Sequence, residues 1–173
     1  PVVLIAGRPH PSDAGVHQVA ADFTAEGRLA AEHFFGLAFR DVVGFGRDPW
    51  GDFQLLFESF REHAEALGMT CHLYRSKQKL RGESQEARAE RRRHEFIEFL
   101  QQAPKPMGVL LPGAMGAARA CAWAPQAGLS VPEDVAILSP HGTEAGRPFC
   151  ETAMPTISSI DVDEKGRLHA VCD

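Results

Sequence analysis

The sequence predicts an α/β fold with a parallel sheet, because short apolar runs alternate with stretches of helical periodicity. The apolar runs begin near residues 42, 69, 108 and 135. They are spaced by about 27, 39 and 27 residues, the length of a strand and a helix joined by short connections. At 44% hydrophobic and 24% charged residues, the 173-residue chain has a globular composition, which excludes disordered, collagen-like and coiled-coil chains.

Two short strands and a helix are predicted for the first 40 residues. The continuous apolar run at residues 2–5 is typical of a buried parallel strand, and residues 19–21 predict a second one. Residues 22–24 offer side chains that can cap the helix after them. The buried face of that helix is predicted from residues at helical spacing: Leu29, Ala30, His33, Phe34 and Leu37.

The next two repeats are more regular. A strand at residues 42–45 precedes a helix whose apolar positions run from Phe53 to Leu67, and Gly68 is its predicted C-cap. A strand at residues 69–74 follows, and then a charged amphipathic helix at residues 85–102.

The predicted elements continue beyond Pro104, which ends that charged helix. Residues 108–111 predict a strand, and an Ala-rich helix runs from there to Gly128. Strands are predicted at residues 135–138 and 157–160, and a further helix begins after Asp163.

The charge balance argues against several function classes. The net charge of −5, from 18 basic and 23 acidic residues, argues against binding nucleic acid through this stretch by counterion release. The basic residues of the stretch 75–93 are interpreted as a solvated helix with its lead-in loop, and less readily as a nucleic-acid face. No apolar run approaches the roughly 20 residues of a membrane helix, so no membrane partner is expected.

Sequence-local motifs indicate neither a cofactor nor an enzyme. The glycines of residues 44–46 follow a strand, but they do not form a dinucleotide fingerprint, and no phosphate-loop motif occurs. The four cysteines lack the short paired spacing of a zinc or redox site, and the histidines form no metal motif. We therefore expect reduced thiols, no metal and no cofactor. Trp50 and Phe53 follow a strand end, where ligands lie in open α/β sheets, although simple packing explains them equally well.

Three segments resemble motifs of LacI/GalR-type sensor domains, in the family's order. Residues 22–40, DFTAEGRLAAEHFFGLAFR, are similar to the family's D-x-x-x-x-G-r-x-A-A-e-h segment. Residues 127–138, AGLSVPEDVAIL, resemble its a-G-x-x-V-P-e-D-v-A signature, and residues 155–160, PTISSI, resemble its P-x-L-[ST]-[ST]-[IV] ending. Within the superfamily, the sequence is most similar to the xylose operon regulator (XylR) type, in which the sensor precedes AraC-type helix-turn-helix motifs.

The resemblance implies a two-lobed periplasmic-binding-protein-like fold that this chain carries truncated at both ends. On that comparison, residues 1–40 are a remnant of the N-terminal lobe, residues 41–155 are the C-terminal lobe, and residues 156–173 are an incomplete crossover back. The implied function is a cytoplasmic, effector-sensing domain of a bacterial transcription regulator. A sugar-like small molecule is the implied partner, DNA is contacted only through a domain absent from this chain, and the full-length protein is a homodimer.

Family members hold sugars with an Arg and acidic residues whose counterparts here are changed. By the resemblance, those positions fall on Leu56 or Gln54, on residues 113–114, and on His141. Loss of the charged, bidentate groups predicts weak or absent binding of ordinary pentoses. The candidate ligand-binding residues at predicted strand ends are Arg8, Trp50, Phe53, Gln54, Gly113 and His141.

Two other function classes stay open at this point. A sugar-binding protein of a transport system has the same kind of fold and no attached DNA-binding part. An α/β enzyme would use the strand-end residues Trp50, Gln54 and His141, although no nucleophile or carboxylate is placed beside them by the sequence.

Overall fold

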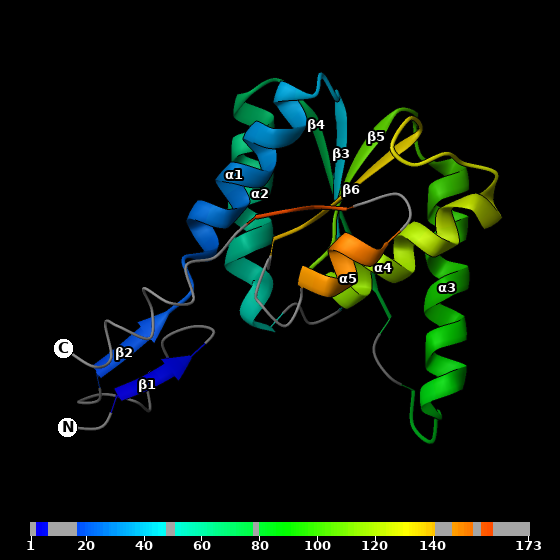
Figure 1. Ribbon diagram of the computed structural model, residues 1–173, viewed down its shortest axis with the longest axis horizontal. Coiled ribbons are helices and arrows are strands. Elements are labelled where there is room, and N and C mark those ends of the chain that lie inside the picture. The colour runs from blue at the N-terminus through cyan, green and yellow to red at the C-terminus, as the bar shows by residue number, and fades with distance from the viewer. Residues whose placement is uncertain are drawn as a thin grey trace.

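The computed structural model describes residues 3–6, 17–47, 51–77, 80–140, 147–153 and 157–160. Within them, a five-stranded parallel sheet has the order β4-β3-β5-β6-β7, and β1 and β2 form a separate parallel pair. The strands are β1 Val3–Ala6, β2 His17–Ala20, β3 Asp41–Arg47, β4 Thr70–Ser76, β5 Met107–Leu110, β6 Val135–Ser139 and β7 Ser158–Ser159 (Figure 1). The predicted parallel α/β fold is confirmed.

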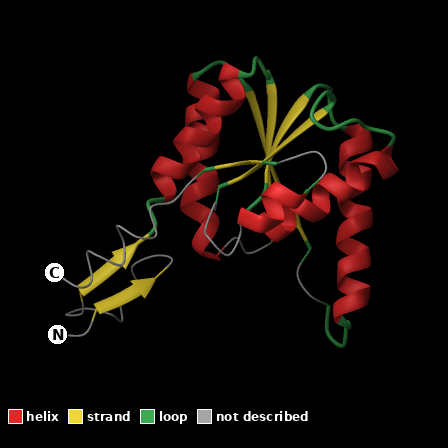
Figure 2. Ribbon diagram, in the orientation of Figure 1, coloured by secondary structure: helices red, strands yellow, loops and turns green. Residues whose placement is uncertain are grey.

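Helices cover both faces of the five-stranded sheet (Figure 2). The α-helices are α1 Phe23–Gly36, α2 Gln54–Ala66, α3 Gln85–Gln102, α4 Ala114–Trp123 and α5 Arg147–Thr152. Short 3-10 turns, η2 Gly51–Phe53 and η3 Ala124–Ala127, precede α2 and follow α4. Helices α1 and α2 lie on one face, and α3 and α4 lie on the other (Figure 1).

The strands divide their side chains between two cores. Val42 and Leu110 pack with α1 and α2, whereas their chain neighbours Val43 and Val109 pack with α3 and α4. This division follows from the pleat, since successive side chains of a strand point to opposite faces. Every residue of β5 and β6 is buried, which explains why both appear in the sequence as continuous apolar runs.

The contacts of α1 give a physical reason for the motif at residues 22–40. The carboxylate of Asp22 accepts a hydrogen bond from the backbone N–H of Ala25 at 2.9 Å and so caps the helix. A Cβ atom at Gly27 would lie 2.5 Å from the backbone oxygen of Leu56, so only glycine lets α1 and α2 approach this closely. The small residues Ala30 and Ala31 are fully buried in the same core.

The predicted buried face of α1 was partly wrong. Leu29 and Leu37 are 40% and 54% exposed. The buried face of the helix is therefore rotated about the helix axis from the predicted one. The buried residues are Phe23, Glu26, Gly27, Ala30, Ala31 and Phe34. The close approach of α2 at Gly27 fixes which face of α1 is covered, and hydrophobicity alone does not contain that information.

Most predicted helix ends agree with the structure. Helix α3 has the predicted bounds, and Gly68 follows α2 with a φ of +79°, a conformation that glycine adopts without strain. The Ala-rich helix is shorter than predicted, because it tightens into η3 at Ala124, beside Pro125, which has no N–H to donate. The helix predicted after Asp163 lies outside the described residues.

The division into lobes stays a prediction. It places residues 1–40, and so α1, with the N-terminal lobe, and residues 41–155 with the C-terminal lobe. In the structure, Phe34 of α1 packs in one core with Val42 of β3 and Leu110 of β5. Helix α1 therefore covers one face of the five-stranded sheet.

The N-terminal end of α3 is held by an ion-pair network. Arg91 contacts Glu83 at 2.8 Å and Glu95 at 2.9 Å. The Arg91 hydrogen bonds lower the pKa of Glu83 to about 2, from an ordinary value of 4.5. The folded protein favours the ionised form of Glu83, so this contact stabilises the fold at pH values above the ordinary pKa of the carboxyl group. The stabilisation is lost as the pH falls toward 2.

We expect Glu83→Gln to reduce the dependence of stability on pH in the acid range. The free energy of unfolding should fall less steeply between about pH 5 and pH 2 in this variant than in the parent protein. Urea denaturation at a series of pH values measures the effect. Glu62→Gln, at an exposed position of α2, is the matched control and should keep the parent slope. Equal slopes in the parent and both variants would contradict the assignment.

Candidate functional site

The parallel strands β3, β4, β5 and β6 end at one edge of the sheet, and α2, α3 and α4 begin there (Figure 1). The carboxyl edge of a parallel sheet is where ligands bind in open α/β folds, because the loops at this edge are free to carry polar groups. The N-terminal ends of the helices add partial positive charge. This edge is therefore the candidate ligand site, and it is the edge that the sequence predicts.

Gly113 lies at this edge, between β5 and α4. It has a φ of +88°, and no heavy atom lies within 4 Å of the position a Cβ would take. The backbone there turns sharply into the helix, and no side chain caps the first turn of α4. Gly113 thus exposes backbone N–H groups at the sheet edge, which can donate hydrogen bonds to a ligand oxygen.

Phe53 and Gln54 lie at the start of α2, on the other face of the sheet. The ring of Phe53 contacts that of Phe23 edge to face, with centroids 5.6 Å apart, so this ring serves the packing of α1. Gln54 is exposed and donates a hydrogen bond from Nε2 to Glu58 at 2.8 Å. The alternative position, Leu56, is fully buried beneath α1, so its side chain cannot reach a ligand.

The other three candidates, Arg8, Trp50 and His141, lie outside the described residues, and their proximity to this edge stays a prediction. Among the described candidates, the structure places Gln54 and Gly113 at the same edge of the sheet but on helices of opposite faces. It assigns Phe53 to the packing between α1 and α2.

Two serines at strand ends were missed by the sequence analysis. Ser76 ends β4 and Ser139 ends β6, and both are fully buried. Neither hydroxyl has a hydrogen-bond partner in the part of the chain that the structure describes. A buried hydroxyl without a hydrogen-bond partner costs about 1–3 kcal/mol of stability. Both serines are therefore further candidates for contact with a ligand at this edge. The signal available in the sequence is a small polar residue that closes an apolar strand.

Part of the basic stretch 75–93 is neutralised within α3. Arg91 pairs with Glu83 and Glu95, and Arg93 pairs with Glu90. The helix carries its own carboxylates, as expected of an exposed amphipathic helix. The interpretation as a solvated helix therefore explains Arg91 and Arg93.

The described cysteines have no features of a nucleophile or a redox pair. Cys71, Cys121 and Cys150 carry thiols that form no disulfide. Burial, with a contribution from Glu65, raises the pKa of the Cys71 thiol to about 12, and burial also raises the pKa of Cys121 and Cys150. A thiol that stays protonated is a poor nucleophile. No metal-binding cluster of His, Cys, Asp or Glu occurs among the residues that the structure describes, and no helix in that part is long and apolar enough to cross a membrane.

Comparison with protein-family models gives one match. Residues 31–170 match the model described as a periplasmic binding protein-like domain, which is most of the chain. No curated protein is similar enough in sequence to match.

Solved structures share the fold over nearly the whole chain. A LacI family transcriptional regulator from Bifidobacterium animalis subsp. lactis aligns with a TM-score of 0.75 at 20% identity, over 98% of this chain and 58% of that one. A LacI family regulator from Arthrobacter sp., in complex with lactose, aligns with a TM-score of 0.74 at 19% identity, over 99% and 58%. The xylose-binding transcription activator xylR aligns with a TM-score of 0.73 at 16% identity, over 99% and 44%. The chain thus spans about 58% of the length of the LacI family regulators.

Proposed function

The chain belongs to the periplasmic binding protein-like domain family, and from this premise we propose that it is the effector-sensing domain of a bacterial transcription regulator of the LacI type. Its ligand is a sugar-like small molecule that binds at the carboxyl edge of the five-stranded sheet. The family match supports the fold and the binding role. The similar folds of regulators, one of them in complex with lactose, support the ligand class.

The main support for the proposed site is that β3, β5 and β6 end at the same edge of the sheet. Gly113 offers backbone donors there, and Gln54 offers a side-chain amide. In the proposed site, Arg8, Trp50 and His141 complete the polar and aromatic contacts. Sugars need such directional contacts, since a hydroxyl buried without a partner weakens binding.

The finer proposal is a regulator of the XylR type, with a fused AraC-type DNA-binding part and a homodimeric assembly. Three sequence motifs in the family's order support it: residues 22–40, 127–138 and 155–160. The chain carries the sensing role only, and the operator is contacted by the DNA-binding part.

The experiment is a thermal-shift screen of the intact protein against pentoses, hexoses and uronic acids. A ligand present at 100 times its dissociation constant stabilises the native state by about 2.7 kcal/mol, so a true effector raises the melting temperature. Gln54→Ala should reduce the shift caused by that sugar. Gln102→Ala, exposed at the far end of α3, should leave it unchanged. A protein that responds to no sugar would contradict the proposed ligand class.

Among the sugars, D-xylose and other ordinary pentoses should bind weakly. Gln54 and residues 113–114 replace the charged groups that the resemblance places there, and each charge-assisted hydrogen bond contributes about 1.5–3 kcal/mol. We therefore expect no measurable heat of binding in calorimetry at micromolar pentose. A micromolar dissociation constant for xylose would show that the uncharged site still holds a pentose.

A separate measurement distinguishes a regulator from a transport protein. Sheared genomic DNA is captured on the intact protein and sequenced, with and without the sugar found in the screen. A regulator enriches defined sequences, and the sugar changes that enrichment. Sugar binding without enrichment of any sequence would favour a transport protein.

A further inference from the structure

A cavity lies between α3 and α4, on the face of the sheet opposite α1 and α2. Its volume is about 200 Å³. Its lining recurs at helical spacing on both helices, with Ala89, Arg92 and Phe96 from α3 facing Met115, Arg119 and Trp123 from α4. An adjoining hollow shares Arg92 and Arg119 and extends to Arg88 at the start of α3.

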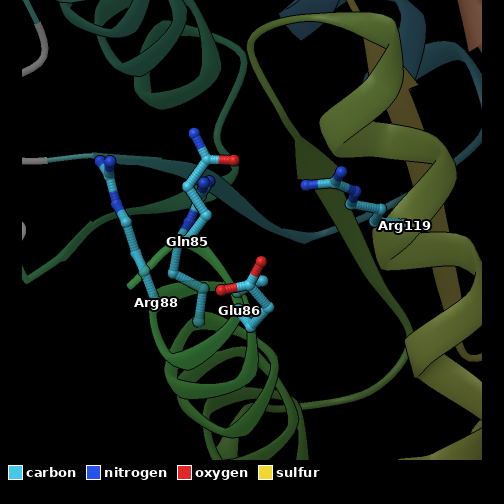
Figure 3. A pocket seen from close by; sticks show the side chains of 6 residues that line it. Gln85, Glu86, Arg88 and Arg119 are labelled. Carbon is cyan, nitrogen blue, oxygen red and sulfur yellow. The ribbon is translucent and has the colours of Figure 1, made fainter. Parts of the chain in front are cut away.

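The cavity has an excess of positive charge. Arg88, Arg92 and Arg119 line the two connected hollows, and Glu86 is the one carboxylate among the lining residues. Figure 3 shows Arg119 extending from α4 toward the part of α3 that carries Gln85 and Glu86. Three guanidinium groups around one hollow repel one another unless an anion lies between them.

The nearby carboxylates are engaged elsewhere. Glu90 pairs with Arg93, and Glu95 pairs with Arg91. Glu86 accepts hydrogen bonds from its own backbone N–H and from Ser84, which lowers its pKa and ties it to the first turn of α3. Among the described residues, these contacts leave Arg88 and Arg119 without an ion-pair partner.

Two of these arginine side chains have no hydrogen-bond acceptor among the residues that the structure describes. Within the described residues, no hydrogen bond or ion pair involves the side chain of Arg88 or of Arg119, although the charge of Arg88 contributes to lowering the pKa of Glu83. The Nε atom of Arg88 is inaccessible to solvent and lacks a hydrogen-bond partner. A guanidinium presents several N–H donors in a planar fork, which matches the oxygens of a phosphate.

The remaining wall of the cavity is apolar. The buried side chains of Phe45, Phe96 and Leu111 line it, together with Trp123. Met115 lies at the rim and is 50% exposed. A molecule that fills the cavity therefore meets both arginine donors and hydrocarbon or aromatic surface.

We propose that the cavity between α3 and α4 binds a phosphate monoester that carries a small apolar group. The phosphate is held by Arg119 together with Arg88 and Arg92, and the apolar group lies against Met115 and Trp123. The cavity adjoins the proposed sugar site, because Pro112 and Met115 of its lining flank Gly113 at the sheet edge, and it adds a second ligand class to the proposed sensor.

Calorimetric titration of the intact protein with butyl phosphate tests the proposal. We expect Arg119→Gln to raise the dissociation constant for butyl phosphate by about tenfold or more, because a charge-assisted hydrogen-bond donor is lost. Arg61→Gln is the matched control, since it removes the same charge from an exposed position of α2 on the opposite face. It should leave the dissociation constant unchanged.

Three comparison probes define the ligand class. Inorganic phosphate should bind more weakly than butyl phosphate, because it lacks the apolar group, and butanol should not bind. Pentanoate should also bind more weakly, since a single negative charge meets three arginines. Tighter binding of pentanoate than of butyl phosphate would overturn the assignment to a phosphate ester.

Two further results would overturn the proposal itself. Equal loss of affinity in Arg119→Gln and Arg61→Gln would show a non-specific charge effect. Sedimentation velocity, which measures whether two copies of the chain associate, gives the second result. If Arg119→Gln shifts the protein toward monomer and butyl phosphate does not bind, the arginines belong to an interface between copies.

Discussion

Gly27→Ala should lower the free energy of unfolding by about 3 kcal/mol, at the upper end of the range for overpacked cores. The added Cβ would lie 2.5 Å from the backbone oxygen of Leu56 and 2.7 Å from the backbone nitrogen of Phe60. Backbone atoms inside α2 cannot move aside as a flexible side chain can. The two helices must separate, and the core they share with β3 and β5 loses contact. Urea denaturation, followed by circular dichroism, measures the change.

Gly36→Ala is the matched control on the same helix. Nothing lies within 4 Å of the position of its added Cβ, and its φ is not positive. Alanine favours helix over glycine by up to about 1 kcal/mol, so this variant should equal or exceed the parent in stability. If Gly27→Ala matched Gly36→Ala, the close approach of α1 to α2 would not exist in solution.

Phe34→Ala should destabilise the protein by about 3–5 kcal/mol, as found for large-to-small changes of buried aromatic residues. Phe34 is fully buried and contacts two other phenyl rings edge to face, Phe39 at 5.9 Å and Phe60 at 6.1 Å between centroids. Its removal leaves a cavity beneath α1 that the sheet cannot fill. The neighbouring Phe35, which is exposed, provides the control, and Phe35→Ala should cost far less.

A double-mutant cycle with Gly108 isolates the contact. A Cβ at Gly108 would lie 2.5 Å from the ring of Phe34, so Gly108→Ala alone forces that ring out of place. In the Phe34→Ala background the space is empty, and the added methyl group fills part of it. We expect the double variant to be more stable than the sum of the single effects predicts, with a coupling of at least about 1 kcal/mol. If the two single effects on the free energy of unfolding simply added, Phe34 and Gly108 would not be in contact.

The elements whose pattern depends on chain-local physics were predicted well. Helix α3 has its predicted bounds because Ser84 caps its first turn and because its charged and apolar positions repeat at helical spacing. The buried strands β5 and β6 stand out as uninterrupted apolar runs. The buried face of α1 was missed at Leu29 and Leu37, since a contact with α2, 29 positions along the chain at Leu56, selects that face.

The candidate site was predicted less completely. The edge follows from the parallel topology, and Gln54 and Gly113 lie on it as predicted. Phe53 packs against Phe23, a partner that no local spacing indicates, and its role in ligand binding stays a prediction. The cavity between α3 and α4 joins Arg92 to Arg119, residues that only the crossover between strands brings together. Sequence spacing cannot show such a pair.

Helix α4 joins the two proposed binding regions physically. It begins beside Gly113 at the sheet edge and carries Arg119 less than two turns later, and its ten residues are well within the length that behaves as one rigid rod. A ligand that shifts the first turn of α4 therefore also shifts the guanidinium. Thermodynamic reciprocity then requires that the factor by which a phosphate ester changes sugar affinity equals the factor by which the sugar changes phosphate-ester affinity. A single short helix thus makes the two binding equilibria interdependent, without any third element between them.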